Sequence, residues 1–233
     1  MTEQTTTDGL FDAVRHNALS LGLFALLTVG LVSLTWLATK DRIVDQVRAS
    51  EERALHEVLP ADRFDNSLLD TSIPLPDTTL LGPVGESARG WVAFHEGDPA
   101  AVILPVVAPD GYSGRIQLLV SIDSHGVLTG VRAVSHKETP GLGDGIDTRV
   151  SNWILAFTGK SLLNPEGAGW GVKKDGGNFD QFTGATITPR AVVGAIHRSL
   201  KYFDANKTTL FTLGSMALTQ QIGQSQKQSG GHL

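Results

Sequence analysis

The sequence predicts an α+β protein, in which a single N-terminal transmembrane helix and stalk precede a small domain of antiparallel strands and packed helices. Three observations predict this class. An uncharged apolar run covers residues 18–38, strand-like patterns follow residue 90, and apolar residues at helical spacing end the domain. The 233 residues suffice for one sizeable domain with an extension.

Composition excludes several classes of function. The chain has no cysteine, which excludes disulfides, cysteine-ligated iron–sulfur clusters and thiol catalysis. Its net charge of −5, without a basic stripe, argues against a nucleic-acid partner.

The apolar run at residues 18–38 contains neither charge nor proline. At a rise of ~1.5 Å per residue, a helix of this length spans about 30 Å, the thickness of a bilayer core. Trp36 lies near its end, where interfacial tryptophans are common. A cleavable signal peptide would have a shorter apolar region and a small-residue cleavage site. We interpret the run as a retained single-pass anchor that follows an N-terminal segment, residues 1–17.

Apolar residues recur at three- and four-residue steps after the anchor, which predicts a helical stalk over residues 39–59, before Pro60. Residues 60–89 are rich in Pro, Asp and Ser and are interpreted as a linker or lead-in.

The folded domain is predicted over residues 90–205. Two strand pairs are expected, residues 90–97 with 100–109 and residues 114–123 with 127–136. Helical spacing follows at residues 147–159 and 189–203. Residues 206–218 carry no assignment, and the Gln-, Ser- and Gly-rich residues 219–233 are expected to form a disordered polar tail.

Familiar catalytic motifs are incomplete. "TGKS" at residues 158–161 resembles the end of a phosphate-binding P-loop, but Ile154 stands where its first glycine is required. The seven histidines lack the spacing of metal ligands. We therefore predict neither catalytic residues nor a metal site.

One candidate binding segment is "SHKETPGLGDGI", residues 135–146. Gly141 and Gly143 would let the backbone approach a ligand closely, because no Cβ intervenes. A turn at the end of a strand is the alternative.

The second candidate segment is "DQFTGATITPRAV", residues 180–192. Thr188 before Pro189 predicts a helix N-cap followed by proline at the first helical position. This leaves Thr183 and Thr186 without a capping role. A phosphate at Thr186 would face the positive end of the helix dipole, although a tight turn fits the same residues.

Both segments resemble the signatures of a known family. "DQFTGATIT" resembles the D-x-x-[ST]-G-A-T-x-[ST] sequence on which a flavin transferase places FMN, and "HKETPGLGD" resembles the family's other motif. Together with the single span, they resemble the covalent-flavin G subunit of the Rnf ion-translocating electron-transport complex, over roughly residues 10–205. The C subunit of the sodium-pumping NADH:quinone reductase is related and shares both motifs.

The resemblance implies covalent FMN, joined through its phosphate to Thr186. Asp180 would be the acidic position that the flavin transferase recognises during maturation, and Leu142 would be an apolar contact of the isoalloxazine ring. The other residues that the resemblance places at the cofactor are Glu138, Thr139, Gly141, Gly143, Thr183, Gly184 and Ala185.

The implied function is electron transfer within a membrane-bound, ion-translocating oxidoreductase, with the other Rnf subunits as partners. The resemblance also places residues 1–17 in the cytoplasm and the C-terminal domain on the periplasmic side of the inner membrane. Lys40, Arg42 and Arg48 follow the span, and a literal positive-inside count gives the opposite orientation, but that rule weakens for long domains. The alternative function is a membrane-anchored sensor or scaffold that binds a phosphate ligand reversibly.

Overall fold

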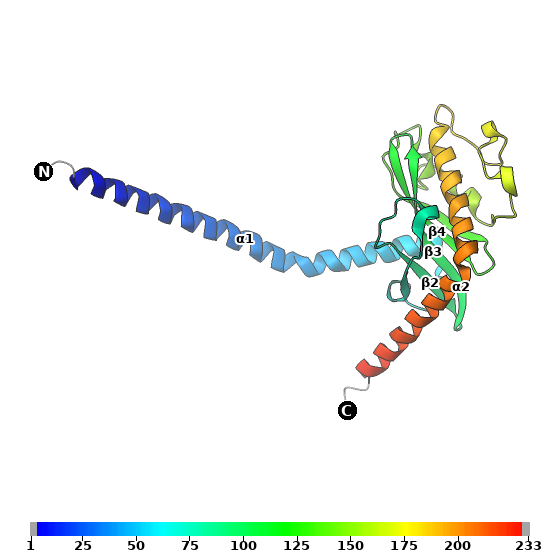
Figure 1. The fold of residues 1–233 in the computed structure, drawn as a ribbon, viewed down its shortest axis with the longest axis horizontal. Coiled ribbons are helices and arrows are strands. Elements are labelled where there is room, and N and C mark those ends of the chain that lie inside the picture. Colours follow the sequence, from blue (N-terminus) through cyan, green and yellow to red (C-terminus); the bar gives the residue numbers. More distant parts are fainter. Residues whose placement is uncertain (1–3, 230–233) are drawn as a thin grey trace. The chain divides into compact units, whose positions relative to one another are not determined.

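The computed structural model describes residues 4–229, with side chains from residue 14 to residue 223. These residues form two long α-helices, α1 (Gln4–Val58) and α2 (Ile187–Ser229), and one five-stranded sheet (Figure 1). The strands are β1 (Ser72–Pro74), β2 (Arg89–His95), β3 (Asp98–Gly111), β4 (Gly114–Asp123) and β5 (Leu128–Ser135). Short 3-10 helices occupy Ala61–Arg63, Leu69–Thr71, Thr78–Leu81, Asp144–Ile146, Trp153–Phe157, Gly167–Gly169 and Lys173–Asp175.

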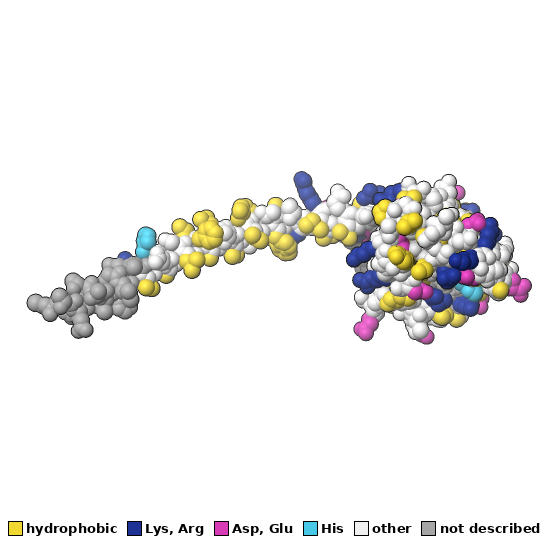
Figure 2. Space-filling model, turned by 90° about the horizontal axis from the view of Figure 1, so that it is seen from above, with side chains coloured by type: hydrophobic (Ala, Val, Ile, Leu, Met, Phe, Trp, Pro, Cys, Tyr) yellow, Lys and Arg dark blue, Asp and Glu magenta, His cyan; other side chains and the backbone are white. Residues whose placement is uncertain are grey.

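The first unit of the chain, up to Ser50, consists of the greater part of α1. The large apolar side chains of residues 14–50 are exposed, and Figure 2 shows hydrophobic residues along this part of the helix. The helix is long and apolar enough to cross a membrane. Thr28, Thr35 and Thr39 donate their hydroxyls to backbone carbonyls four residues earlier, at 2.9, 2.8 and 2.7 Å. Bonds of this kind satisfy hydroxyl groups on an apolar helix without a partner outside it.

The second unit, Glu51–Leu233, contains the sheet, whose strands pair in the order β1-β2-β3-β4-β5. Every neighbouring pair is antiparallel, and the two expected strand pairs are β2 with β3 and β4 with β5. Together with the helices, this arrangement confirms the predicted α+β class.

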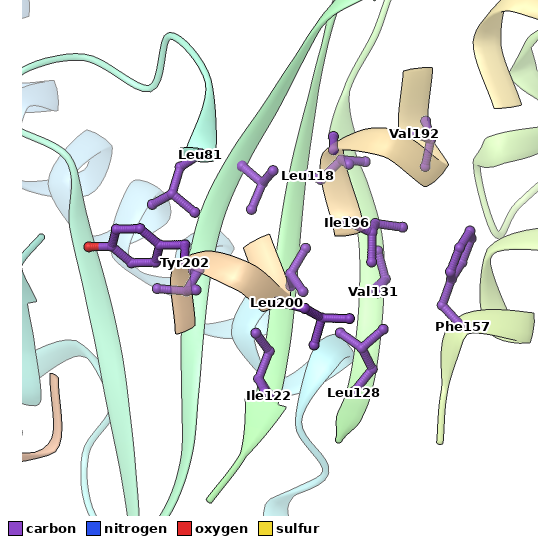
Figure 3. Packing of buried hydrophobic residues seen from close by; sticks show 14 of the residues in the cluster. Leu81, Leu118, Ile122, Leu128, Val131, Phe157, Val192, Ile196, Leu200 and Tyr202 are labelled. Atoms are coloured by element: carbon purple, nitrogen blue, oxygen red, sulfur yellow. The ribbon is translucent and has the colours of Figure 1, made fainter. Parts of the chain in front are cut away.

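Strand β3 explains why both faces of the sheet are covered. Its side chains alternate: Val102, Leu104 and Val106 belong to the core that α2 covers, whereas Ala101 and Ile103 belong to a second core. Figure 3 shows Val192, Ile196 and Leu200 of α2 beside the strand residues Leu118, Ile122, Leu128 and Val131.

The last turn of α1 and the residue after it contribute to the second core, together with Leu68. Leu55, Val58 and Leu59 are buried against the opposite face of the sheet, with Leu119 of β4. Gly130 of β5 permits this contact, because a Cβ at that position would overlap the carbonyl of Val58. The end of the long helix is therefore part of the domain's core.

The lead-in, residues 60–89, is integrated into the domain, which differs from the expected linker. It supplies β1, and the Asn66 side chain donates to the Val92 carbonyl (3.0 Å) and accepts from the Phe94 amide (2.7 Å). The Tyr202 hydroxyl of α2 donates to the Pro76 carbonyl at 2.7 Å. Composition alone could not predict these bonds, because their partners lie far away in the sequence.

Helix α2 also differs from expectation. It includes residues 206–218, which carried no assignment, and continues to Ser229 through a segment expected to be disordered. Leu210 is buried against the sheet, and Gly214 lies where a Cβ would be 2.7 Å from the Val92 side chain. This packing continues the helix beyond residue 205, and no proline interrupts it. Residues 230–233 of the expected tail, and residues 1–3, lie outside the described range. The helical pattern at residues 147–159 corresponds only to turns and the 3-10 helix Trp153–Phe157.

Replacing Gly130 with alanine should destabilise the domain. The added methyl group would force the end of α1 away from the sheet, and such overpacking costs about 1–3 kcal/mol of unfolding free energy. Chemical unfolding of the solubilised chain, followed by tryptophan fluorescence, measures this change. Gly171→Ala is the matched control, because its Cβ would meet the Ala168 carbonyl at an ordinary 3.6 Å. Equal stability of the two variants would contradict the packing described.

Candidate functional site

The two segments singled out in the sequence meet at one pocket of about 350 Å³. One wall comes from the loop after β5 and the opposite wall from the segment that enters α2. The lining residues are Tyr112, Glu138, Thr139, Leu142, Gly143, Gly184, Ala185, Thr186, Ile187 and Thr188. The volume is within the range of small-molecule and cofactor sites.

The first wall is a tight turn. The Thr139 carbonyl accepts hydrogen bonds from the amides of both Leu142 and Gly143, each at 3.1 Å. Gly141 has a φ of +75°, a conformation that glycine adopts without strain. Leu142 is 48% exposed, so the turn presents an apolar side chain at the edge of the pocket.

A buried carboxylate joins this turn to its surroundings. Glu138 is 5% exposed, and its Oε1 accepts a hydrogen bond from the Ser113 amide at 3.0 Å. Its Oε2 accepts a hydrogen bond from the hydroxyl of Thr188, which is fully buried. Gly143 is needed beside this pair, because a Cβ there would lie 2.8 Å from Glu138 Oε2.

The second wall contains the start of α2, which lies two residues earlier than expected. The Thr186 carbonyl accepts the Arg190 amide at 3.2 Å, so Thr186 is the N-cap residue and Ile187 the first helical residue. The prediction that Thr188 caps the helix is therefore wrong. The Thr188 hydroxyl instead donates a hydrogen bond to the Glu138 carboxylate. This partner lies 50 residues away, so the local sequence could not predict the bond.

The Thr186 side chain is half-buried and lines the pocket, whereas Thr183 is exposed and lies outside the lining. Within the described residues, no protein group hydrogen bonds to the Thr186 hydroxyl, and the amides of Ile187 and Thr188 have no protein acceptor. Gly184, with a φ of +77°, forms the turn that places Thr186 at the pocket.

Aromatic residues pack against the segment that precedes α2. Phe182 packs edge-on against Trp153, with ring centroids 5.2 Å apart, and lies over Gly145, where a Cβ would be 2.9 Å from its ring. The Trp153 indole donates to the Asp180 carbonyl at 2.8 Å. The Asp180 carboxylate lies outside the pocket lining, on the surface, and is paired with Lys173 at 2.6 Å.

Asp147 and Arg149 form an ion pair in the segment that follows the turn of the first wall. The Arg149 guanidinium hydrogen bonds to both oxygens of Asp147 and lowers the pKa of that carboxyl from 3.8 to about 2, against the opposing effect of burial. His136, 3.8 Å from Asp147, contributes in the same direction as Arg149.

The structure thus gathers most of the predicted residues and leaves three outside the pocket lining, namely Gly141, Thr183 and Asp180. Sequence reasoning missed Tyr112 and Ile187. Tyr112 lies in the turn between β3 and β4, and its only local signal is an aromatic residue within a glycine-flanked hairpin turn. Among residues 14–223, no cluster of metal-binding side chains is present.

Comparison with known proteins identifies the family to which the chain is related. The FMN-binding domain family matches residues 111–201, which include both walls, and the RnfG N-terminal region family matches residues 1–58. Similar proteins, each named as the G subunit of an ion-translocating oxidoreductase complex, occur in Pseudomonas aeruginosa (strain UCBPP-PA14), Shewanella loihica and Pseudoalteromonas atlantica. The identities are 55%, 50% and 40%, over 84%, 85% and 91% of this chain and 91%, 93% and 98% of the relatives.

The apolar N-terminal helix and the match to the FMN-binding domain family thus define a membrane-associated FMN-binding protein. The similarity to the relatives covers most of this chain and most of each relative, which defines a narrower family. The chain belongs to the RnfG family, the G subunits of the Rnf ion-translocating oxidoreductase complexes.

The Asp147–Arg149 pair should make stability depend on pH. Because the folded pKa of Asp147 is lowered, the pair stabilises the fold above the unfolded pKa of 3.8, and this contribution is lost as the pH falls toward about 2. Asp147→Asn should reduce the unfolding free energy at neutral pH, because the ion pair with Arg149 is lost. The loss should be only about 1 kcal/mol, because the guanidinium is exposed and solvent screens the pair.

Unfolding of the solubilised chain at several pH values measures this difference. Arg149→Ala should give a similar loss, and the double variant should be no less stable than the worse single variant. A difference that persists unchanged down to pH values of about 2 would contradict the assignment.

Proposed function

We propose that this chain, an electron-carrier subunit of an Rnf ion-translocating complex, holds its FMN through a phosphoester to Thr186. The observation that carries the attachment is the position of Thr186. It is the N-cap of α2, it lines the pocket, and within the described residues its hydroxyl has no protein partner.

The start of α2 suits a phosphate group. The amides of Ile187 and Thr188 are directed to no protein acceptor in the described chain, and the positive end of the helix dipole favours an anion. Pro189 has no amide hydrogen, so these two groups are the amide donors of the first turn. They lie directly after Thr186, where an attached phosphate would need them.

The rest of the pocket suits a flat apolar ring. Leu142 and Ile187 are 48% and 45% exposed, and Tyr112 supplies an aromatic side chain from the neighbouring hairpin. Gly184 and Ala185 keep the second wall low, because they add little or no side chain. Thr139 and Gly143 would contribute backbone to the seat, and Gly141 would set the shape of its turn.

When bound, FMN supplies the redox chemistry, and the protein holds it and adjusts its potential. Attachment through the phosphate would leave the ring free of covalent substitution. The surrounding residues need only bind, orient and partly desolvate the ring. Electron transfer of this kind requires no acid–base residue from the chain.

Attachment would be catalysed by a separate flavin transferase. The Thr186 hydroxyl oxygen would form the new bond to the FMN phosphorus of FAD, the bond between the two phosphates would break, and AMP would leave with the displaced oxygen. Asp180 is exposed on the segment that such an enzyme would contact, with Thr183 between it and Thr186. We assign both residues to recognition by the transferase, since both lie outside the pocket lining.

The remaining proposals concern the membrane. We assign the chain to the inner membrane, with residues 1–17 in the cytoplasm and the folded domain on the periplasmic side, as the resemblance to the family implies. The other Rnf subunits would be its partners within the bilayer and at the domain surface.

Thr186→Ala should abolish covalent flavin. The full chain, purified from cells with an active flavin transferase, should give a fluorescent band on a denaturing gel and a mass increase equal to FMN less one water. The Thr186→Ala variant should be dark, because the acceptor oxygen is missing. Thr212→Ala, which changes an exposed threonine elsewhere on α2, should remain fluorescent.

A band that persists in Thr186→Ala but disappears in Thr183→Ala would move the attachment to Thr183. A dark wild-type band, with flavin released on denaturation, would favour reversible binding of a phosphate ligand over covalent attachment.

Protease treatment tests the orientation. In spheroplasts, protease added outside should digest residues 60–205, because the domain would face the exposed periplasmic side. A cytoplasmic marker protein in the same sample should stay intact. Protection of the domain until the membrane is lysed would contradict the periplasmic assignment.

A further inference from the structure

We propose that Glu138 acts as a positioning residue. Its carboxylate ties the β3–β4 turn and the first turn of α2 to the loop after β5, and it thereby sets the geometry in which the pocket holds flavin and presents Thr186. This inference rests on the proposed function for its flavin measurements, and on the structure alone for the hydrogen bonds.

The carboxylate bridges segments that are distant in the sequence. Oε1 accepts from the Ser113 amide, 25 residues earlier, and Oε2 accepts from the Thr188 hydroxyl, 50 residues later. Each oxygen therefore has a protein donor from a different element. We call these three residues, Ser113, Glu138 and Thr188, the carboxylate clasp.

Because Glu138 is buried, its carboxylate requires hydrogen-bond donors from the protein. Glu138 is 5% exposed and Thr188 is fully buried, whereas Ser113 lies on an exposed turn, so water cannot readily replace the Thr188 hydroxyl. A buried carboxylate is strongly destabilising unless its oxygens are hydrogen-bonded. The favourable arrangement of the pocket is therefore the one in which both outer segments reach the Glu138 side chain.

Two glycines show how closely the surrounding backbone approaches the clasp. A Cβ on Gly111, beside the β3–β4 turn, would lie 3.0 Å from Glu138 Oε1. A Cβ on Gly143 would lie 2.8 Å from Glu138 Oε2 and 2.9 Å from Thr188 Oγ1. Backbone thus surrounds the carboxylate on both sides, which leaves it little freedom to turn toward a ligand.

The clasp controls two edges of the pocket. Ser113 is adjacent to Tyr112, and Thr188 is two residues beyond Thr186, so each hydrogen bond of Glu138 fixes a neighbour that lines the pocket. Both carboxylate oxygens are already engaged by the protein. Glu138 therefore acts on the flavin through Tyr112 and Thr186.

The test uses the full chain and measures the initial rate of covalent flavin incorporation by purified flavin transferase with FAD, and the fluorescence anisotropy of the attached flavin. Thr188→Val removes the hydroxyl while retaining the side-chain shape, and Glu138→Ala removes the carboxylate. Each should slow incorporation about tenfold and lower the anisotropy, because one buried charge-assisted hydrogen bond or more is lost. The double variant should be no slower than the slower single variant, since the two residues act through one bond.

Conservative variants and matched controls complete the design. Thr188→Ser and Glu138→Gln retain hydrogen-bonding groups and should recover most of the wild-type rate and anisotropy. Thr212→Val on α2 and the exposed Glu86→Gln should behave as wild type. If Glu138→Ala fails to fold, Thr188→Val with its serine rescue carries the test alone.

Amide hydrogen exchange on the flavin-free chain separates the clasp from the proposed function. Thr188→Val should accelerate exchange at the Ser113 amide and in residues 185–190. A Thr188→Val variant that matches Thr212→Val in exchange, rate and anisotropy would overturn the clasp, whatever the effect of Glu138→Ala. Accelerated exchange in a chain whose wild type takes no covalent flavin would support the clasp and overturn only the proposed attachment.

Discussion

The sheet must be covered on both faces, and this constraint determines where the pocket forms. Strand β3 alternates apolar side chains toward both sides, so neither face can be left in water without a large loss of hydrophobic free energy. Helix α2 covers one face and the last turn of α1 covers the other. Because α2 is held by Val192, Ile196 and Leu200 along its buried side, its first residue has a defined position (Figure 3). That position is beside the loop after β5, and Thr186 therefore lines the same pocket as the glycine-rich turn.

Hydrogen bonds between segments that packing has brought together then fix the geometry of the pocket. Glu138 requires two donors because it is buried, and it obtains them from two segments that packing has already placed nearby. As a result, Thr186 and Thr188 have different hydrogen-bonding roles. Thr188 donates to a buried carboxylate, whereas the hydroxyl of Thr186, the N-cap residue, has no protein partner among the described residues. Both roles depend on the start of α2 at Ile187.

Much of this organisation was predictable, and the failures share one cause. The two strand pairs, the apolar helix and the two segments that meet at the pocket depend on patterns within a few residues, which can be recognised in the sequence. The role of Thr188, the contribution of Tyr112 and the integration of Asn66 depend on partners 20 or more residues away. Physics at the level of the sequence indicated an anion near Thr186, and only the family resemblance indicated FMN. The extent of α2 was missed because residues 206–218 form too short a segment to assign by themselves. In the structure Leu210, Leu213 and Ala217 continue the face of α2 that packs on the core, and Gly214 lies against Val92 of β2.

The burial of Leu55, Val58 and Leu59 determines how the domain can be excised for study. A soluble fragment that begins at residue 60 or 90 would lack this layer and would expose Ala101, Ile103 and Leu119 as a continuous apolar strip. Exposed strips of this kind promote aggregation. A fragment that begins at or shortly before Glu51 would keep the layer while omitting the apolar run. The useful cut therefore lies inside a helix, several turns after the last membrane-spanning residue, and not in the irregular segment that follows it.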